Sequence, residues 1–345
     1  MGYKLVIYDV SPFVYAVADI KKYSDKYRHG FPVGGMLHFL KYLTLDLGCN
    51  NDVILCFDSK SFRKELYPKY KAGRKANYSV YAQLDLLYEM LSACGVTCLK
   101  VNGYEADDLI YTVMERFRGK YSEIEIRGSD YDLVHNIVNY NEAFIPANSK
   151  VNVITARTFK DALYENEMIL FNTISAYKVL TGDKSDNIPA FKSAKGLTGH
   201  AIYDLLRRSV LSSKTVFKTE VLRSRQFLEV FLKKLSGQLN ELDYEALRLN
   251  MDLVFPKYCK EVECSDSCNI KSINKKDLAS FLTLLNDQRS LENVGLTMLG
   301  YTETLVEKVK RMGKELRTGE YAADRGKTFT PVTVNAGLTN LREFK

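Results

Sequence analysis

The chain has 345 residues, 46% of them hydrophobic, and a net charge of +7. This is enough for a large core in two domains, and no apolar run approaches membrane-spanning length. We expect no secretory signal, because the chain opens directly on a strand-like run instead of a basic head and an apolar stretch. Seven cysteines argue against a disulfide framework and favour a reducing, cytoplasmic location, or the host cytoplasm if the chain is viral.

The N-terminal half alternates short apolar runs with helical stretches, which is typical of buried parallel strands in an α/β layer fold. The predicted strands are 4–9, 53–57, 97–101, 123–127 and 151–154. The predicted helices are 34–46, 80–93, 105–118, 158–165 and 168–180. We therefore expect residues 1–180 to form a central, mostly parallel sheet flanked by helices. Residues 181–300 are predicted to form a helical region, and residues 301–345 a charged, flexible tail with one more helix at its start, 301–318.

Acidic residues gather in short motifs and at the ends of predicted strands. They are Asp9, Asp58, Glu105, Asp107, Asp108, Asp130, Asp132, Asp183 and Asp186. Four of them fall at or just beyond the C-terminal ends of strands, the edge where open parallel sheets build their sites. Carboxylates gathered this closely repel one another unless cations hold them. Clusters of oxygen ligands suit Mg²⁺ or Mn²⁺ and not zinc, so the first hypothesis is a metal-dependent phosphoryl-transfer site.

Two stretches of the chain are strongly basic. Residues 60–78 carry seven Lys and Arg side chains against one Glu, and residues 207–234 carry eight against two. Beside a carboxylate cluster, such stretches indicate a polyanion that is both bound and cut. The alternative for each stretch taken alone is a solvated surface.

Four motifs together resemble one family. They are Phe57–Arg74 (FDSKSFRKELYPKYKAGR), Gly103–Leu109 (GYEADDL), Ser129–Leu133 (SDYDL) and Thr181–Pro189 (TGDKSDNIP). In this order and spacing, the chain resembles the 5′-nucleases over about residues 1–210. That family includes the flap endonucleases, the bacteriophage 5′→3′ exonucleases and the 5′-nuclease domain of bacterial DNA polymerase I. The resemblance implies a PIN-like core with a basic arch at about residues 60–95.

The resemblance also implies two Mg²⁺ ions, with Mn²⁺ as a substitute. One ion is held by residues matching Asp58, Glu105, Asp107 and Asp108. The second is held by residues matching Asp130, Asp132 and Asp186, while Asp9 and Asp183 match positions that act directly or through water. Two such ions clamp the attacking and leaving oxygens of a phosphodiester. The expected products carry a 5′-phosphate and a 3′-hydroxyl.

Several residues are expected to contact DNA. Lys71 and Arg74 are predicted one helical turn apart, as two cations for the scissile phosphate. Tyr70 is expected to stack on a base, with simple packing as the alternative. Asp183–Leu206 matches a helix–three-turn–helix whose usual glycines are partly replaced, so the family's monovalent-ion site is not carried over. The further predicted phosphate contacts are Arg63, Lys75, Lys192, Lys195, Arg207, Arg208, Arg223 and Arg225.

The sequence therefore predicts a monomeric, Mg²⁺-dependent 5′→3′ exonuclease and flap endonuclease for DNA with 5′ ends or flaps. Removal of RNA from RNA–DNA hybrids and a replication partner bound through residues 301–345 are further expectations. Two alternatives stay open, namely a related nuclease that prefers RNA and a branched-DNA-binding protein without catalysis. A dinucleotide-binding enzyme is excluded, because no Gly-x-Gly-x-x-Gly follows the first predicted strand.

Overall fold

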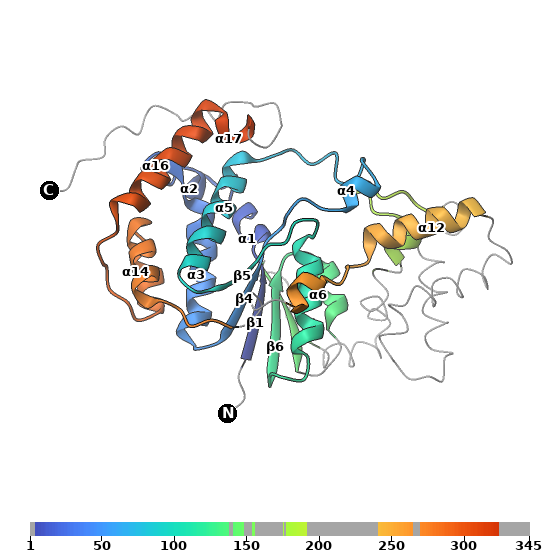
Figure 1. Ribbon diagram of the computed structural model, residues 1–345, viewed down its shortest axis with the longest axis horizontal. Helices are drawn as coiled ribbons and strands as arrows, with labels where there is room; N and C mark the ends of the chain where they lie inside the picture. Colours follow the sequence, from blue (N-terminus) through green and yellow to red (C-terminus); the bar gives the residue numbers. More distant parts are fainter. Residues whose placement is uncertain are drawn as a thin grey trace. The chain divides into compact units, whose positions relative to one another are not determined.

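The computed structural model of the chain describes residues 4–137, 141–147, 154–155, 175, 177–191, 241–264 and 270–323. The chain divides into two compact units, each assembled from separate segments (Figure 1). Unit 1 comprises Met1–Asp9, Asn51–Lys75 and Thr97–Ile270. Unit 2 comprises Val10–Asn50, Ala76–Val96 and Lys271–Lys345.

Unit 1 is built on a six-stranded sheet with the strand order β5-β4-β1-β6-β7-β8. All neighbouring strands run parallel except β7 and β8. The strands are β1 (Lys4–Asp9), β4 (Asp52–Cys56), β5 (Thr97–Leu99), β6 (Glu123–Gly128), β7 (Glu142–Pro146) and β8 (Ile154–Thr155). The predicted central, mostly parallel sheet with flanking helices is confirmed.

The core of unit 1 lies between the sheet and α6 (Ala106–Phe117). Apolar residues of β1, β4 and β6, such as Leu5, Ile54 and Ile126, are fully buried against Leu109, Val113 and their neighbours on α6. Because helical side chains three or four residues apart share one face, α6 turns an apolar stripe to the sheet. This packing fixes the start of α6 at the edge where β1, β4 and β6 end.

Strand β7 was not predicted from the sequence. Its first residue, Glu142, is only 1% exposed, and Arg118 Nε donates to its carboxylate at 2.8 Å. The run 142–146 contains a charged residue and a proline, a pattern that does not indicate a strand. In the structure, Arg118 neutralises the charge of Glu142. The predicted helix 158–165 lies outside the described residues.

The remaining described elements of unit 1 are short or follow α6 in the chain. They are α4 (Arg63–Leu66), the 3-10 helix η1 (Tyr131–Asn136), α12 (Glu241–Val254) and α13 (Lys260–Cys264). Residues 67–77 are turns and extended chain, so Lys71 and Arg74 do not share a helix face as predicted. Lys71 has a positive φ of 53°, and its backbone N–H donates to the carbonyl of Asp186 at 3.0 Å. This long-range contact replaces helical bonding.

Unit 2 is mostly helical. Its elements are α1 (Ser11–Tyr15), α2 (Lys21–Ser24), β2 (Tyr27–Arg28), β3 (Phe31–Pro32), α3 (Gly34–Gly48), α5 (Tyr78–Ala93), α14 (Lys275–Leu284), α15 (Gln288–Asn293), α16 (Glu303–Thr318) and α17 (Glu320–Ala323). Side chains of Asn77, Asn274 and Asp287 cap the helices that follow them.

The segment predicted as a charged, flexible tail begins with ordered helix. Thr302 caps α16, and Gly319 ends it in the left-handed conformation that glycine favours. Its Val309 and Leu316 are buried, so the start of this segment packs as part of unit 2, and residues 324–345 lie outside the described residues. None of the helices in the described part of the chain is long and apolar enough to span a membrane.

Candidate active site

Three adjacent parallel strands bring acidic residues to one edge of the sheet. Asp9 ends the central strand β1 and pairs in register with Cys56, the last residue of β4. Asp58 and Asp130 each lie two residues beyond the ends of the strands on either side, β4 and β6. Their predicted convergence at the C-terminal edge of the sheet follows from this parallel register.

A glycine allows the chain to pack closely at this edge. A Cβ on Gly128 would lie 2.7 Å from Leu133 Cδ1 and 3.3 Å from the Cβ of Asp9. Any larger residue at the end of β6 would push against the Asp9 side chain.

The start of α6 adds further carboxylates to the same edge. The backbone N–H of Ala106 donates to Asp58 Oδ1 at 2.9 Å, so the loop after β4 is tied to the first turn of the helix. Glu105 is the N-cap of α6 and forms a capping box with Asp108, while Asp107 lies in the first turn. Carboxylates near a helix N-terminus are stabilised by the helix dipole.

Asp9, Asp58, Asp107 and Asp130 form a group that we call the repelling cluster. Burial raises the pKa of Asp9 well above its usual value, and the neighbouring Asp58, Asp107 and Asp130 raise it further. Burial, Asp130 and Glu105 likewise raise the pKa of Asp107, although Lys71 opposes them. Asp9 is 6% exposed, and its buried Oδ1 has no hydrogen-bond partner among the residues that the structure describes. Buried acids in this state favour uptake of either a proton or a cation.

The repelling cluster fits a divalent cation by the chemistry of its donors. All of them are carboxylate oxygens, Asp9 Oδ1 has no hydrogen-bond partner within the described part of the chain, and neighbouring charges disfavour the ionised form of Asp9. Within the part of the chain that the structure describes, however, no three acidic, histidine or cysteine side chains converge as the ligands of one ion. The other predicted ligands each contact an ammonium or guanidinium group of the chain, and they are Glu105, Asp108, Asp132, Asp183 and Asp186.

Glu105 and Asp186 share the cation of Lys71. The Lys71 ammonium lies 2.7 Å from Glu105 Oε1 and 3.8 Å from Asp186 Oδ2. Arg74 Nη2 donates to Asp186 Oδ1 at 2.5 Å. Burial alone would raise the pKa of Glu105, but Lys71 and Arg63 outweigh it and hold that pKa below its usual value. The structure thus places both predicted catalytic cations, Lys71 and Arg74, among the acidic residues.

Asp132 and Asp183 share a second cation, Lys178, which sequence reasoning missed. Its ammonium lies 2.5 Å from Asp132 Oδ2 and 2.7 Å from Asp183 Oδ2. Burial and the charge of Asp130 raise the pKa of Asp132 to about 6 despite this pair. The pKa of Asp183 falls to about 2, because Lys178 and Ser185 donate to it and outweigh its burial. A signal was present in the sequence, since Lys178 lies on the helical residues 177–181 that lead into the Thr-Gly-Asp motif.

The Thr-Gly-Asp turn depends on its glycine. Gly182 has a φ of +74°, and a Cβ there would lie 2.5 Å from the carbonyl oxygen of Ile188. The backbones of Asp183 and Ile188 exchange two hydrogen bonds of 2.9 and 2.8 Å. The turn therefore closes on itself and aims Asp183 and Asp186 from one short segment.

Three predicted site residues, Tyr70, Arg63 and Asp108, are buried in the structure. Tyr70 is 3% exposed, and its hydroxyl donates to Glu105 Oε2 at 2.9 Å, so the ring packs in the core and does not stack on a base. Arg63 is also 3% exposed and pairs with Asp108, which is 0% exposed. Arg63 is therefore not a surface phosphate contact. Packing against α12 covers Tyr70 and Arg63.

The other predicted DNA contacts differ in status. Lys75 is exposed, as are Lys60, Lys64 and Lys69 of the same basic stretch. The remaining predicted contacts lie outside the described residues, and they are Lys192, Lys195, Arg207, Arg208, Arg223 and Arg225.

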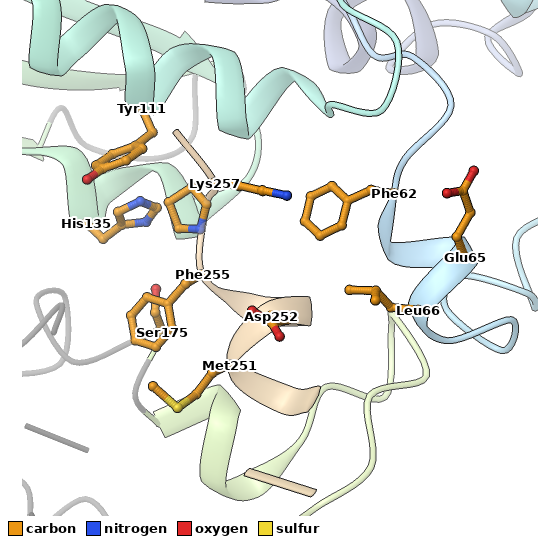
Figure 2. Close-up of a pocket in the computed structure, with 11 residues that line it drawn as sticks. Phe62, Glu65, Leu66, Tyr111, His135, Ser175, Met251, Asp252, Phe255 and Lys257 are labelled. Carbon is orange, nitrogen blue, oxygen red and sulfur yellow. The ribbon is translucent and has the colours of Figure 1, made fainter. Parts of the chain in front are cut away.

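A cavity of about 540 Å³ lies in unit 1 near Arg63. Figure 2 shows its lining, in which Lys257 points toward the ring of Phe62, with Phe255 and His135 alongside. The Lys257 ammonium lies 4.6 Å from the centre of that ring. None of the four members of the repelling cluster lines this cavity. The cavity and the carboxylate site are therefore separate features that share the Phe62–Arg63 segment.

Comparisons with known proteins agree with this geometry. Residues 4–164 match the family of the 5′-3′ exonuclease N-terminal resolvase-like domain. DNA polymerase I of Treponema pallidum (strain Nichols) is 30% identical over 179 residues, which cover 49% of this chain and 18% of that protein. The 5′-3′ exonuclease of Bacillus subtilis (strain 168) is 31% identical over 185 residues, which cover 52% of this chain and 60% of that protein. The chain thus spans less than two thirds of the length of these curated relatives.

A solved structure supports the fold. The T5 D15 protein co-crystallized with metal ions has a TM-score of 0.50 to this chain at 14% identity, and the likeness covers 90% of this chain and 99% of that one. The match over residues 4–164 includes the sheet, the start of α6 and the carboxylates of the first three motifs. Residues 4–164 therefore match the 5′-3′ exonuclease N-terminal resolvase-like domain, and the comparisons support the resemblance to the 5′-nuclease family.

Proposed function

We propose that this protein is a divalent-metal-dependent phosphodiesterase that acts on DNA with 5′ ends or 5′ flaps, as a 5′→3′ exonuclease and flap endonuclease. The observation that carries the proposal is the repelling cluster, in which burial and the neighbouring carboxylates raise the pKa of Asp9 and of Asp107, near the cations Lys71 and Arg74. The names of the relatives, a 5′-3′ exonuclease and a DNA polymerase I, support it.

The carboxylates are proposed to hold Mg²⁺ ions, two in number, with Mn²⁺ as a substitute. Asp9, Asp58, Asp107 and Asp130 are the first candidates, because they lie at one edge of the sheet, where burial and neighbouring carboxylates raise the pKa of Asp9 and Asp107. Bound divalent ions supply the Lewis acidity that activates water and stabilises the departing 3′-oxygen of a phosphodiester.

Basic residues of the protein then orient the DNA strand and balance the charge of its phosphates. Arg74 has 57% of its side chain exposed while one guanidinium nitrogen contacts Asp186, so its other donors are open to a phosphate. Lys71 lies deeper, with 18% of its side chain exposed, and its ammonium offers a point charge close to Glu105. Phosphate oxygens that approach this pair compete with the carboxylates for the same donors. Lys60, Lys64, Lys69 and Lys75 provide phosphate contacts that hold the strand without reading its sequence.

The experiment that tests the proposal is cleavage of a 5′-flap DNA, end-labelled, with Mg²⁺ and with excess chelator. We expect Mg²⁺-dependent release of products with a 5′-phosphate and a 3′-hydroxyl. Matched RNA and RNA–DNA substrates at the same salt concentration measure the preference between DNA and RNA. Cleavage that continues in chelator, or binding of flap DNA with no cleavage in Mg²⁺ or Mn²⁺, would overturn the proposal.

The proposal also covers the oligomeric state of the protein, its cellular location and its binding partners. A monomer that acts on replication or repair intermediates belongs where DNA is, in the cytoplasm of a bacterial cell or of a host. Size-exclusion chromatography with light scattering, alone and with flap DNA, tests the monomeric state. Removal of residues 324–345 tests whether a replication partner binds through the end of the chain.

A further inference from the structure

We propose that Arg63 and Asp108 form a buried positioning pair that sets Glu105 and the start of α6, and that Asp108 is not an ion ligand. This assigns Asp108 a different role from its neighbour Asp107, although the two are adjacent in one motif. The expected effects of this pair on kcat rest on the proposed function. Its expected effects on melting temperature and Mn²⁺ binding do not.

Every hydrogen-bond site of the Asp108 carboxylate is used inside the protein. Oδ1 accepts from Arg63 Nη2 at 2.8 Å and from the Lys257 backbone N–H at 2.7 Å. Oδ2 accepts from Arg63 Nη1 at 2.7 Å and from the Glu105 backbone N–H at 3.0 Å. A carboxylate offers about four lone-pair sites, so this one, which is 0% exposed, has none left for a cation.

Arg63 is equally saturated. Its guanidinium has five N–H donors, and all five find acceptors. Besides the two bonds to Asp108, Nη1 donates to Glu105 Oε2 at 3.2 Å. Nε donates to the Leu253 carbonyl at 2.9 Å, and Nη2 donates to the Phe255 carbonyl at 3.1 Å. A side chain 3% exposed with no donor left does not bind a phosphate, but it does join three parts of unit 1.

The three parts joined are the end of α12, the segment after β4 and the start of α6. The planar guanidinium accepts only one arrangement of these groups, because its donors have a fixed fork geometry. Glu105 is then held on one side by Arg63 and Tyr70 and on the other by Lys71. The pair therefore decides where the Glu105 carboxylate lies relative to Asp9, Asp58 and Asp107.

The same pair connects the site with the neighbouring cavity. The ammonium of Lys257 faces the ring of Phe62 in Figure 2. Phe62 directly precedes Arg63 in the chain, and the backbone N–H of Lys257 donates to Asp108. The Phe255 carbonyl that receives Arg63 Nη2 also belongs to a cavity-lining residue. A displacement of Phe255 is therefore transmitted to Glu105 through two hydrogen bonds, one from Arg63 to the Phe255 carbonyl and one from Arg63 to Glu105.

Asp107 provides the matched comparison for a test. In chelator, Asp108→Asn is expected to lower the melting temperature by roughly 5–10 °C, because it leaves a buried Arg63 short of its partner. Asp107→Asn is expected to leave that temperature unchanged or higher, because it removes a repelled charge. Binding of Mn²⁺ without DNA, measured by electron paramagnetic resonance, is expected to weaken more in Asp107→Asn than in Asp108→Asn.

A double-mutant cycle tests whether the two residues act as one unit. If Asp108 acts through Arg63, the variant carrying both Arg63→Gln and Asp108→Asn loses no more kcat on flap DNA than the worse single variant, within about threefold. KM for DNA is expected to stay within about twofold in all three. Arg63→Lys, which keeps the charge with fewer donors, serves if Arg63→Gln does not fold.

Val113→Ala on the same helix α6 controls for stability alone. It is expected to lower the melting temperature through a cavity in the core while kcat stays near the wild-type value. An equal kcat loss in Val113→Ala would reduce the pair to a general structural role and overturn the proposal. So would an unchanged melting temperature in Asp108→Asn together with Mn²⁺ binding as weak as that of Asp107→Asn. If the wild type cleaves nothing, the proposed function fails, and the melting and Mn²⁺ measurements still decide the role of Asp108.

Discussion

The carboxylates of unit 1 exist in two contrasting settings. Asp9, Asp58, Asp107 and Asp130 gather at one edge of the sheet, where burial, and after it repulsion by neighbouring carboxylates, raises the pKa of Asp9 and Asp107. Glu105, Asp132, Asp183 and Asp186 each contact an ammonium or guanidinium group from the chain. The same residue type thus stabilises the fold in one setting and opposes it in the other. The difference teaches that an external cation is most needed where burial and neighbouring carboxylates disfavour the charged form.

The largest expected effect comes from the repelling cluster. Asp107→Asn is expected to reduce kcat on flap DNA by at least about a thousandfold, because it removes an ion-binding oxygen while hardly touching the fold. Single-turnover cleavage in Mg²⁺ measures the loss, and a gel-shift in chelator measures the DNA binding that remains. Glu115→Gln, another acidic residue of α6, is the control and is expected to retain activity. Full activity in Asp107→Asn would show that the cluster does not carry the chemistry.

The next largest effect concerns Asp132 and Asp183, whose charges Lys178 already balances. Lys178→Met leaves Asp132 and Asp183 without their shared ammonium, so the free energy of unfolding in chelator is expected to fall by about 1.5–3 kcal/mol. In Mg²⁺ this deficit is expected to shrink, because an ion replaces the lost charge. Denaturant unfolding in the two buffers measures it. Lys310→Met removes only an exposed pair with Glu307 and is expected to change little. Equal deficits of Lys178→Met with and without Mg²⁺ would contradict competition between lysine and ion.

A smaller effect, of opposite sign, is expected at Asp9. Burial and the neighbouring carboxylates raise the pKa of Asp9, so its ionised form opposes folding at neutral pH, and Asp9→Asn is expected to raise the free energy of unfolding in chelator. In Mg²⁺ the order is expected to reverse, because the ion stabilises only the wild type. Asp52→Asn at the opposite end of β4 is the control, and it is expected to destabilise because Asp52 accepts a hydrogen bond from Tyr121. A loss of stability in Asp9→Asn in chelator would remove repulsion as the property that defines the cluster.

The sequence predicted the setting of the repelling cluster better than that of the buried acids. Asp9 and Asp130 follow from strand ends, because an apolar run fixes a strand and parallel pairing fixes the edge at which it ends. Arg63 and Asp108 escaped prediction because their partners are distant in the chain. Arg63 Nε bonds to Leu253, 190 residues away, and Asp108 bonds to Lys257. The local sequence does not show that the two residues meet, and only tertiary packing shows that they neutralise each other.

The smallest expected effect separates burial from stacking at Tyr70. In the structure its hydroxyl donates to Glu105, so Tyr70→Phe is expected to lower the free energy of unfolding by about 1–2 kcal/mol and to leave DNA affinity unchanged within about twofold. An exposed ring that stacks on a base would instead make the hydroxyl dispensable for stability. Thermal melting in chelator and DNA titration over a range of salt concentrations measure the two quantities. The exposed Lys75 offers the contrast, because Lys75→Ala is expected to keep stability and to lower the dependence of DNA affinity on salt by about one phosphate contact. A Tyr70→Phe protein as stable as the wild type would contradict a stabilising role of this hydroxyl and would favour contact of Tyr70 with the substrate. It would also weaken the distinction between the neutralised carboxylates and the repelling cluster.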